Sequence, residues 1–219
     1  MNGYIDGIDF INLPAEKYWT LPKTKKDVKT DIRNRIYSGD YIGAEKIDGT
    51  YQKCIRDEDG NFHLIARNQS VSGEMTDKVE WCPQFNPFFE TLPNGTCLLC
   101  ELHMAQNTSS RKITTIMGCL KDKAIARQQK DGYLWLYVFD VWAYNGHSCL
   151  SLTARERFEL LAKIAKKYYY APYIRFAKYY EGDALWNELM RVMSSGGEGI
   201  VITRADSHAE PGKRTAQKT

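Results

Sequence analysis

Apolar and polar positions along this chain of 219 residues alternate in blocks that predict both amphipathic helices and strands. Apolar side chains that recur every three or four residues indicate helices, and residues such as Thr, Asp and Gly mark their ends. Thr153 and Glu156 have the spacing of a capping box, and Asp183 is expected to cap a later helix. The pattern predicts helices over residues 24–38, 121–130, 153–167 and 183–194.

Strands are predicted where β-branched and aromatic residues run together between turn residues. The run over residues 133–142 is strongly β-prone and is expected near the centre of a sheet. The dipeptide Asn145-Gly146 that follows it is typical of a hairpin turn. The other predicted strands cover residues 40–44, 50–56, 62–66, 95–103, 173–180 and 200–203, whereas residues 107–118 indicate a loop or short elements.

Two carboxylates interrupt apolar strands, Glu101 in residues 95–103 and Asp140 in residues 133–142. A charge inside an apolar strand is unfavourable unless it has a partner. For Glu101 a salt bridge, a ribose hydroxyl or a metal ion would each serve, and Asp140 poses the same question. His103 can share the face of Glu101, but a lone histidine in a strand is more often structural.

The stretch Glu45-Lys46-Ile47-Asp48-Gly49 lies between two predicted strands. Residues two apart in an extended segment share a face, so Lys46 and Asp48 are expected to look into one pocket. Gly49 is expected to permit a positive φ. The plain interpretation is a hairpin turn beside an exposed lysine. The chemical one is a nucleophilic amine, whose pKa of about 10.4 would be lowered by burial or by a neighbouring cation.

Two more polar groups adjoin apolar strands. Arg67 directly follows the strand at 62–66, where a guanidinium can grip a phosphate or carboxylate, or can form a surface salt bridge. Glu198 stands between glycines at the entrance to the strand at 200–203. It is either a metal-side or phosphate-side group or an ordinary loop carboxylate.

Composition and charge add limits rather than a function. The formal net charge is only +3, but Lys and Arg cluster over residues 23–29, 111–130 and 204–218, a pattern that suits either a nucleic-acid surface or solvated faces. The N-terminus lacks the apolar run of a signal peptide, and no stretch is long enough to cross a membrane. The six cysteines are therefore expected as reduced thiols, with Cys97 and Cys100 in the core rather than on a metal.

In chain order these residues resemble the motifs of the covalent nucleotidyltransferase superfamily, which comprises DNA ligases, RNA ligases and mRNA capping enzymes. Its KxDG, arginine, strand-glutamate, Phe-Asp and Glu-Gly motifs all have a match, in the family's order. The resemblance spans about residues 40–214. The matching segments are Lys46 to Gly49, Arg67, Glu101, Phe139-Asp140 and Glu198-Gly199.

Within the superfamily the chain looks most like the adenylation domain of ATP-dependent DNA ligases, because Pro211-Gly212-Lys213-Arg214-Thr215 follows the Glu-Gly motif. Two positions depart from that pattern. DNA ligases usually have an arginine where this chain has Tyr51, and a glutamate where it has Ala44. Glu45, directly before the lysine, is more like RNA ligases and capping enzymes. These enzymes remain the alternative function, and a non-catalytic nucleic-acid-binding domain is a further one.

The resemblance implies an α+β fold of the ATP-grasp-like nucleotidyltransferase type, with antiparallel β-sheets flanked by helices and a nucleotide groove between them. It also implies a reaction in three steps. Lys46 attacks the α-phosphate of ATP and forms a covalent lysine–AMP. AMP then passes to a 5′-phosphate at a nick in duplex DNA, and the 3′-hydroxyl seals the strand with release of AMP.

The resemblance also implies residue roles. Lys46 and Asp48 would be catalytic. Phe139 would stack on adenine, Glu101 would bind a ribose hydroxyl, and Arg67 would hold the ribose or the incoming 5′-phosphate.

The remaining implied roles concern phosphates and metal. Mg²⁺ suits a site of carboxylate, phosphate and water oxygens, and Glu198 is the first candidate ligand, followed by Asp48 and Glu101. The other implied cofactor-binding residues are Glu45, Lys213 and Arg214, with the last two near phosphates.

The extent of the chain is part of the same expectation. The family's final lysine pair and its OB-fold should follow Thr219, so we expect residues 1–219 to be one adenylation domain, truncated before the last motif and without the OB-fold. We expect a monomer, not bound to a membrane, that acts on nicked DNA in replication or repair. It would work in the cytoplasm, whether encoded by a cell or by a virus or phage that acts in its host.

Overall fold

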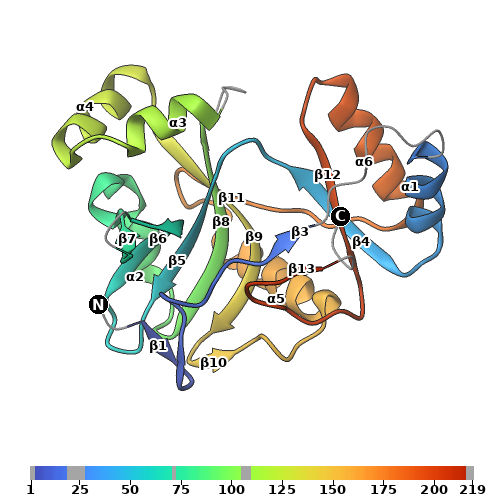
Figure 1. Ribbon diagram of the computed structural model, residues 1–219, viewed down its shortest axis with the longest axis horizontal. Coiled ribbons are helices and arrows are strands. Elements are labelled where there is room, and N and C mark those ends of the chain that lie inside the picture. Colours follow the sequence, from blue (N-terminus) through green and yellow to red (C-terminus); the bar gives the residue numbers. More distant parts are fainter. Residues whose placement is uncertain (1–2, 19–27, 71–72, 105–109, 216–219) are drawn as a thin grey trace.

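The chain folds around two β-sheets of unequal size, with helices on their outer faces and two further two-stranded pairs, β1-β2 and β13-β3, as a computed structural model shows for residues 3–18, 28–70, 73–104 and 110–215 (Figure 1). Nearly all strand pairs are antiparallel, and two short pairs are parallel. This arrangement confirms the expected α+β class with antiparallel sheets and flanking helices.

The large sheet has seven strands in the order β10-β9-β8-β5-β6-β7, with β11 beside β9. Its central strands are long and largely buried, because both faces of the sheet are covered. Strand β9 has neighbours on both sides, as its β-prone sequence predicts. The strand bounds are β5 Thr50–Arg56, β6 Phe62–Gln69, β7 Met75–Asp77, β8 Thr96–Met104, β9 Leu134–Tyr144, β10 His147–Ser148 and β11 Ile174–Phe176.

The small sheet pairs β4 (Tyr41–Lys46) with β12 (Gly199–Arg204) and lies to the right of the large sheet in Figure 1. Helices α1 (Val28–Tyr37) and α6 (Gly182–Ser194) cover it, and Ile36, Leu185 and Ile202 form the buried centre of this unit. Strand β4 does not pair with β5. The segment after Lys46 therefore crosses from one sheet to the other and is not a hairpin turn.

Two hydrophobic clusters cover opposite faces of the large sheet. Four helices and two 3₁₀ turns pack on one face, and the N-terminal segment packs on the other. Cys100 belongs to the first cluster and Cys97 to the second, which confirms that both are core residues pointing to opposite faces. The elements of the helical face are η1 Val79–Trp81, η2 Pro83–Phe85, α2 Asn86–Thr91, α3 Ser110–Met117, α4 Lys121–Asp131 and α5 Ala154–Lys167.

The N-terminal segment, with β1 (Tyr4–Ile5), β2 (Ile8–Asp9) and β3 (Lys17–Tyr18), is fastened by a buried lysine. Lys53 on β5 is 1% exposed and donates hydrogen bonds of 2.6–2.7 Å to the carbonyl oxygens of Phe10, Ile11 and Leu13. Burial lowers the pKa of Lys53 to about 8, which still leaves the amine mostly protonated at pH 7. Three carbonyls match the three donors of an ammonium group.

Several predicted elements need correction. The strand predicted over residues 173–180 is only β11, and β6 continues through Arg67 to Gln69. The N-cap of α6 is Glu181, so Asp183 lies in the first turn instead of capping the helix. Residues 107–118 contain a helix, α3, where a loop or short elements were expected.

Other elements were predicted correctly. The capping box of α5 forms as expected from Thr153 and Glu156, and α4 matches the predicted basic helix. Asn145 and Gly146 take positive φ values of 53° and 81° in the turn between β9 and β10. The first four residues of the helix predicted over 24–38 lie outside the described residues. Among the helices described, none is long and apolar enough to cross a membrane.

We predict that Lys53→Met destabilises the protein by about 3 kcal/mol, because it leaves three buried carbonyl oxygens without a donor. Urea denaturation measures this change. The matched control is Lys121→Met, which removes an exposed ammonium paired with Glu80 and should leave the free energy of unfolding almost unchanged. Equal losses in the two variants would contradict the fastening role of Lys53.

Candidate active site

A cavity of about 400 Å³ lies where the small sheet meets the large one. Its walls come from β4, β5, β6, β8, β9 and β12, with the N-terminal segment and α3 at its edges. This volume falls in the range of small-molecule sites. Of the residues singled out in the sequence, the cavity gathers Glu45, Lys46, Asp48, Arg67, Glu101 and Phe139.

Lys46 is the last residue of β4, as the sequence predicts, and its side chain is only 23% exposed. Its amine forms an ion pair with Glu198. Glu198 is close to Lys46 because the next residue, Gly199, pairs with Lys46 across the small sheet. The Tyr18 ring centroid is 5.6 Å from the Lys46 Nζ. Burial alone would lower the pKa of Lys46, but Glu198 and Tyr18 outweigh it and the pKa is raised. The expected lowering is therefore wrong for this state of the site.

The turn after Lys46 passes very close to β8. A Cβ placed on Gly49 would lie 2.3 Å from the Leu102 carbonyl oxygen and 2.5 Å from the Glu101 Cγ. Gly49 is not among the glycines with positive φ, so the predicted backbone reason is wrong and close approach is the actual one. Asp48 lies beyond this contact, and its Oδ2 accepts a 3.4 Å hydrogen bond from the Ser110 backbone at the start of α3.

Glu101 stands in β8 with its side chain in the cavity wall. It forms no ion pair within the described residues, so of the alternatives that its sequence position raised, a salt bridge is excluded there. Burial raises the pKa of Glu101 to about 8, although Lys46 and Arg67 act to lower it. At neutral pH the carboxyl is mostly protonated and can donate as well as accept a hydrogen bond.

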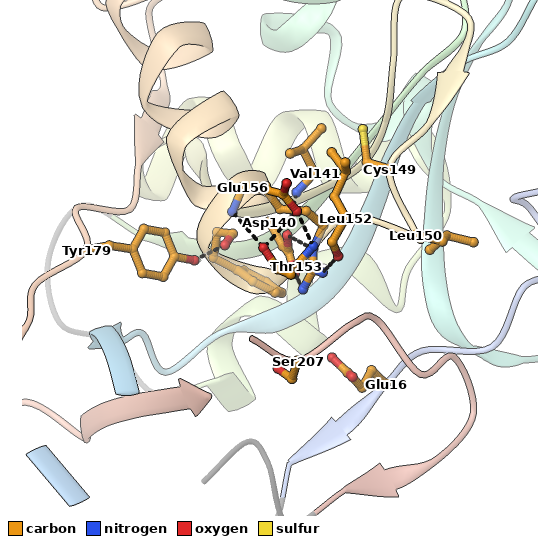
Figure 2. Close-up of polar contacts among 12 residues, drawn as sticks. Glu16, Asp140, Val141, Cys149, Leu150, Leu152, Thr153, Glu156, Tyr179 and Ser207 are labelled. Carbon is orange, nitrogen blue, oxygen red and sulfur yellow. Dashed lines mark hydrogen bonds and ion pairs between the residues drawn. The ribbon is translucent and has the colours of Figure 1, made fainter. Parts of the chain in front are cut away.

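Phe139 lines the cavity from a β-bulge in β9. Two successive residues of β8 pair with Asp140 and Val138, so Phe139 is the extra residue of β9 at this point. Next to it, Asp140 is buried and receives two hydrogen bonds from Arg157 of α5, at 2.9 and 3.3 Å. Figure 2 shows Asp140 among the contacts at the start of this helix, with Tyr179 to one side. The Tyr179 hydroxyl donates to the Phe139 carbonyl oxygen. Arg157 is thus the partner that Asp140 required.

Other predicted residues lie at the margin. The Glu45 carboxylate faces Arg191 of α6 at 2.9 Å, and Arg191 also binds Glu188. Lys213 and Arg214 do not line the cavity. Arg214 starts the two-residue strand β13 (Arg214–Thr215), which pairs in parallel with β3 and so adjoins Tyr18.

Sequence reasoning missed several cavity residues because nothing local marks them. Tyr18 and Glu16 come from an irregular segment, and Ser110 and Thr114 come from a helix that was not predicted. Tyr137 was detectable, since it shares a strand face with Phe139. The missed lining residues are Glu16, Tyr18, Tyr51, Ser110, Thr114, Tyr137, Val201 and Thr203.

The donor chemistry fits an anionic nucleotide better than a preformed metal cage. Lys46 and Arg67 supply positive charge, Phe139 and Tyr137 supply rings, and the volume admits a small molecule. Within the part of the chain described, no three His, Cys, Asp or Glu residues gather as a metal site. Magnesium commonly uses one or two carboxylates together with phosphate and water oxygens, and the site offers the Asp48 carboxylate in the cavity wall and the Glu198 carboxylate at Lys46.

This combination of fold and site is typical of a nucleotide-binding domain with a lysine at the centre of its pocket. The chain belongs to the family of ATP-dependent DNA ligase domains, because the model for "ATP dependent DNA ligase domain" matches residues 21–218. None of the curated protein sequences matches it significantly.

Solved structures of low sequence identity share the fold. The ligase domain of M. tuberculosis LigD has a TM-score of 0.68 at 18% identity, over 96% of this chain and 59% of that one. A mycobacterial DNA ligase D complexed with ATP and MES has a TM-score of 0.66 at 18% identity, over 96% and 60%. The bacteriophage T7 ATP-dependent DNA ligase complexed with ATP has 0.58 at 16% identity, over 94% and 68%. This chain therefore spans about three fifths of the first two structures.

We predict that Arg157→Met destabilises the protein by about 4 kcal/mol, because it leaves the Asp140 carboxylate buried without a counter-charge. Thermal and urea unfolding measure the loss. Arg155→Met is the matched control two residues away. Its exposed pair with Glu181 should contribute less than about 1 kcal/mol. A small effect at Arg157, like that at Arg155, would contradict the role of the buried pair.

A second prediction concerns pH. Folding raises the Glu101 pKa from 4.5 to about 8, so between these values the folded state holds a proton that the unfolded state has lost. Rising pH therefore destabilises the protein across this window, by up to about 1.4 kcal/mol per pH unit, and the effect is complete above pH 8. Glu101→Gln lacks this titration. Its stability relative to wild type should rise from pH 5 to 8, and a constant difference would refute the assignment.

Proposed function

We propose that the protein is the adenylation domain of an ATP-dependent DNA ligase that joins strands through a covalent lysine–AMP on Lys46. The observation that carries the proposal is the position of Lys46, at a strand end inside the cavity and in contact with Glu198, in a chain of this ligase family. Two of the similar structures are described as complexes with ATP, which supports the choice of nucleotide.

The nucleotide would lie across the cavity with its base beside Phe139. The polar Glu101 and the apolar Val201 of β12 also line this cavity. Glu101, protonated or not, can bind a ribose hydroxyl. Arg67 is exposed at the mouth and would meet the ribose or a 5′-phosphate. Glu45 would contribute its backbone to the wall of the site, because its carbonyl oxygen accepts a 3.3 Å hydrogen bond from the Tyr137 hydroxyl.

In the first step the Lys46 Nζ lone pair attacks the α-phosphorus of ATP. A P–N bond forms and the P–O bond to pyrophosphate breaks, with the amine proton lost to a base or solvent. The ion pair keeps the amine protonated, so Glu198 must give up this contact before attack. Arg67 offers positive charge at the cavity mouth. Lys213 and Arg214 would approach phosphates only if the segment at the start of β13 moves toward the cavity.

A magnesium ion would be held by Glu198 and Asp48, with phosphate and water oxygens completing its shell. Glu101 is a weaker candidate because its carboxyl is mostly protonated at neutral pH. When bound, the ion offsets the negative charge that develops on the phosphates.

The later steps need a DNA partner. A 5′-phosphate oxygen at the nick attacks the lysine–AMP, which breaks the P–N bond and forms a DNA–adenylate. The 3′-hydroxyl then attacks the 5′-phosphorus, and AMP leaves as the strand is sealed. We propose that the chain acts as a monomer on nicked duplex DNA inside the cell, in repair or replication. Contacts with DNA phosphates should make binding weaken with salt.

The test is intact mass after incubation with Mg²⁺ and ATP, GTP or NAD in separate reactions. We predict a one-AMP adduct from ATP alone and none in Lys46→Ala. Lys53→Arg is not a suitable control, because Lys53 is structural, whereas Lys121→Ala changes an exposed lysine far from the cavity and should react like wild type.

Other outcomes would redirect the proposal. An adduct from GTP would favour a capping-type nucleotidyltransferase. If no nucleotide reacts, a nick that already carries the DNA–adenylate is supplied. Sealing there would retain the ligase function, and failure in both reactions would reject it.

A further inference from the structure

Four side chains form a row across the floor of the cavity. Tyr51 on β5 pairs with Glu101 on β8, and Glu101 pairs with Tyr137 on β9. The pair Gln52 and Ala66 fixes the register of β5 and β6. One step further along this register, Arg67 stands opposite Tyr51. Side chains opposite each other on neighbouring strands are close enough to interact.

The Tyr51 ring lies between two groups that face the nucleotide space. The Arg67 guanidinium carbon is 5.1 Å from the ring centroid, and the Phe139 ring centroid is 6.2 Å away at 53°. Tyr51 itself is only 7% exposed, so it cannot turn away without opening the core beneath it. A guanidinium over an aromatic face is attracted by the ring quadrupole.

Arg67 has little else to hold it. It is exposed, and within the described residues no ion pair or hydrogen bond involves its side chain. Other arginines are held by carboxylates, as Arg155 and Arg191 are, or by backbone carbonyl oxygens, as Arg56 is. A ring contact holds the guanidinium without consuming its N–H donors, which remain available to a phosphate.

The Tyr51 hydroxyl adds a second observation. It is buried and has no hydrogen-bond partner among the described residues. Burial raises the pKa of Tyr51 well above its usual value, so the hydroxyl is neutral. Among the described residues, the hydroxyl makes no hydrogen bond that would explain a tyrosine at position 51. The contribution of the side chain therefore lies in its ring.

We infer that Tyr51 is a positioning residue whose ring holds Arg67 over the cavity, with the guanidinium donors directed to a phosphate of the nucleotide or of the DNA 5′ end. The inference rests on the proposed function, because it assigns Tyr51 to the same site. It adds that the anion-binding geometry of Arg67 is set by an aromatic ring on the neighbouring strand rather than by a carboxylate.

The experiment compares Tyr51→Leu, which keeps an apolar side chain but removes the ring, with Tyr51→Phe, which keeps the ring and removes the hydroxyl. The rate of lysine–AMP formation and of nick sealing is measured against ATP and nicked-DNA concentration. Relative to Tyr51→Phe, we expect Tyr51→Leu to weaken binding of ATP or nicked DNA roughly three- to tenfold, as loss of one cation–π contact implies. Equal constants for the two variants would overturn the inference.

The double variant separates positioning from simple packing. If Tyr51 acts through Arg67, then Tyr51→Leu should cost nothing further once Arg67→Gln is present. Full additivity of the two losses would contradict the inference. The pair of Arg33 and Tyr37, neither of which lines the cavity, offers a matched control. Tyr37→Leu removes a comparable contact, in which the Arg33 guanidinium carbon is 5.7 Å from the ring centroid. It should leave both reactions unchanged.

A readout independent of activity completes the test. Protons next to a guanidinium stacked on a ring are shifted upfield, so the Arg67 Hδ resonances should be upfield in wild type and Tyr51→Phe and normal in Tyr51→Leu. Unshifted resonances in wild type would overturn the inference even if the reaction proceeds. Absence of any adduct or sealing in wild type, with the shift present, would instead reject the proposed function and leave the Arg67 geometry established.

Discussion

The wall of the cavity depends on one buried ion pair, between Asp140 on β9 and Arg157 on α5. Both side chains are about 1% exposed, so removing either would leave a charge without compensation in the core. The pair holds α5 against the sheet at the β-bulge of β9, in which Phe139 is the extra residue. Phe158 of the same helix stacks on Tyr179, which in turn binds the Phe139 backbone. The constraint that docks the helix therefore also orients the aromatic wall of the site.

The charges around Lys46 describe a resting state. Glu198 holds the proton on the amine, while burial keeps Glu101, which lines the same cavity, mostly neutral. The Glu198 carboxylate thus keeps the Lys46 amine protonated, and the protonated Glu101 adds no negative charge to the cavity. A polyphosphate that entered the cavity would change the protonation of both groups. Because Lys46 and Gly199 are directly paired across the small sheet, the ion pair forms from the backbone register and needs no movement. The proposed attack by the amine, by contrast, would require the carboxylate to leave it.

The sequence predicts most elements, and it identifies six of the residues that line the cavity, because its signals there are local. Lys46 at a strand end, Phe139 in a β-prone run and the α5 capping box each follow from neighbouring residues. The partners of Asp140 and Glu45 could not be found in this way, since Arg157 and Arg191 lie on helices that approach only in the folded chain. The Gly49 prediction failed for a related reason. The glycine serves a contact with β8, about fifty residues further on, and not its own backbone angle.

The cavity is a property of the contact between two sheets rather than of either one. Lys46 belongs to the small sheet and Glu198 directly precedes its strand β12, while Arg67, Glu101 and Phe139 belong to the large sheet. The turn through Asp48 and Gly49 joins the two sheets. Because that turn lies against the Glu101 strand with no room for a Cβ, the distance between Lys46 and the wall that carries Glu101 is set at one backbone contact. A side chain at position 49 would separate the two halves of the site while leaving each sheet intact. The spacing of the two halves of the site and the contact between the two sheets therefore depend on the same backbone at position 49.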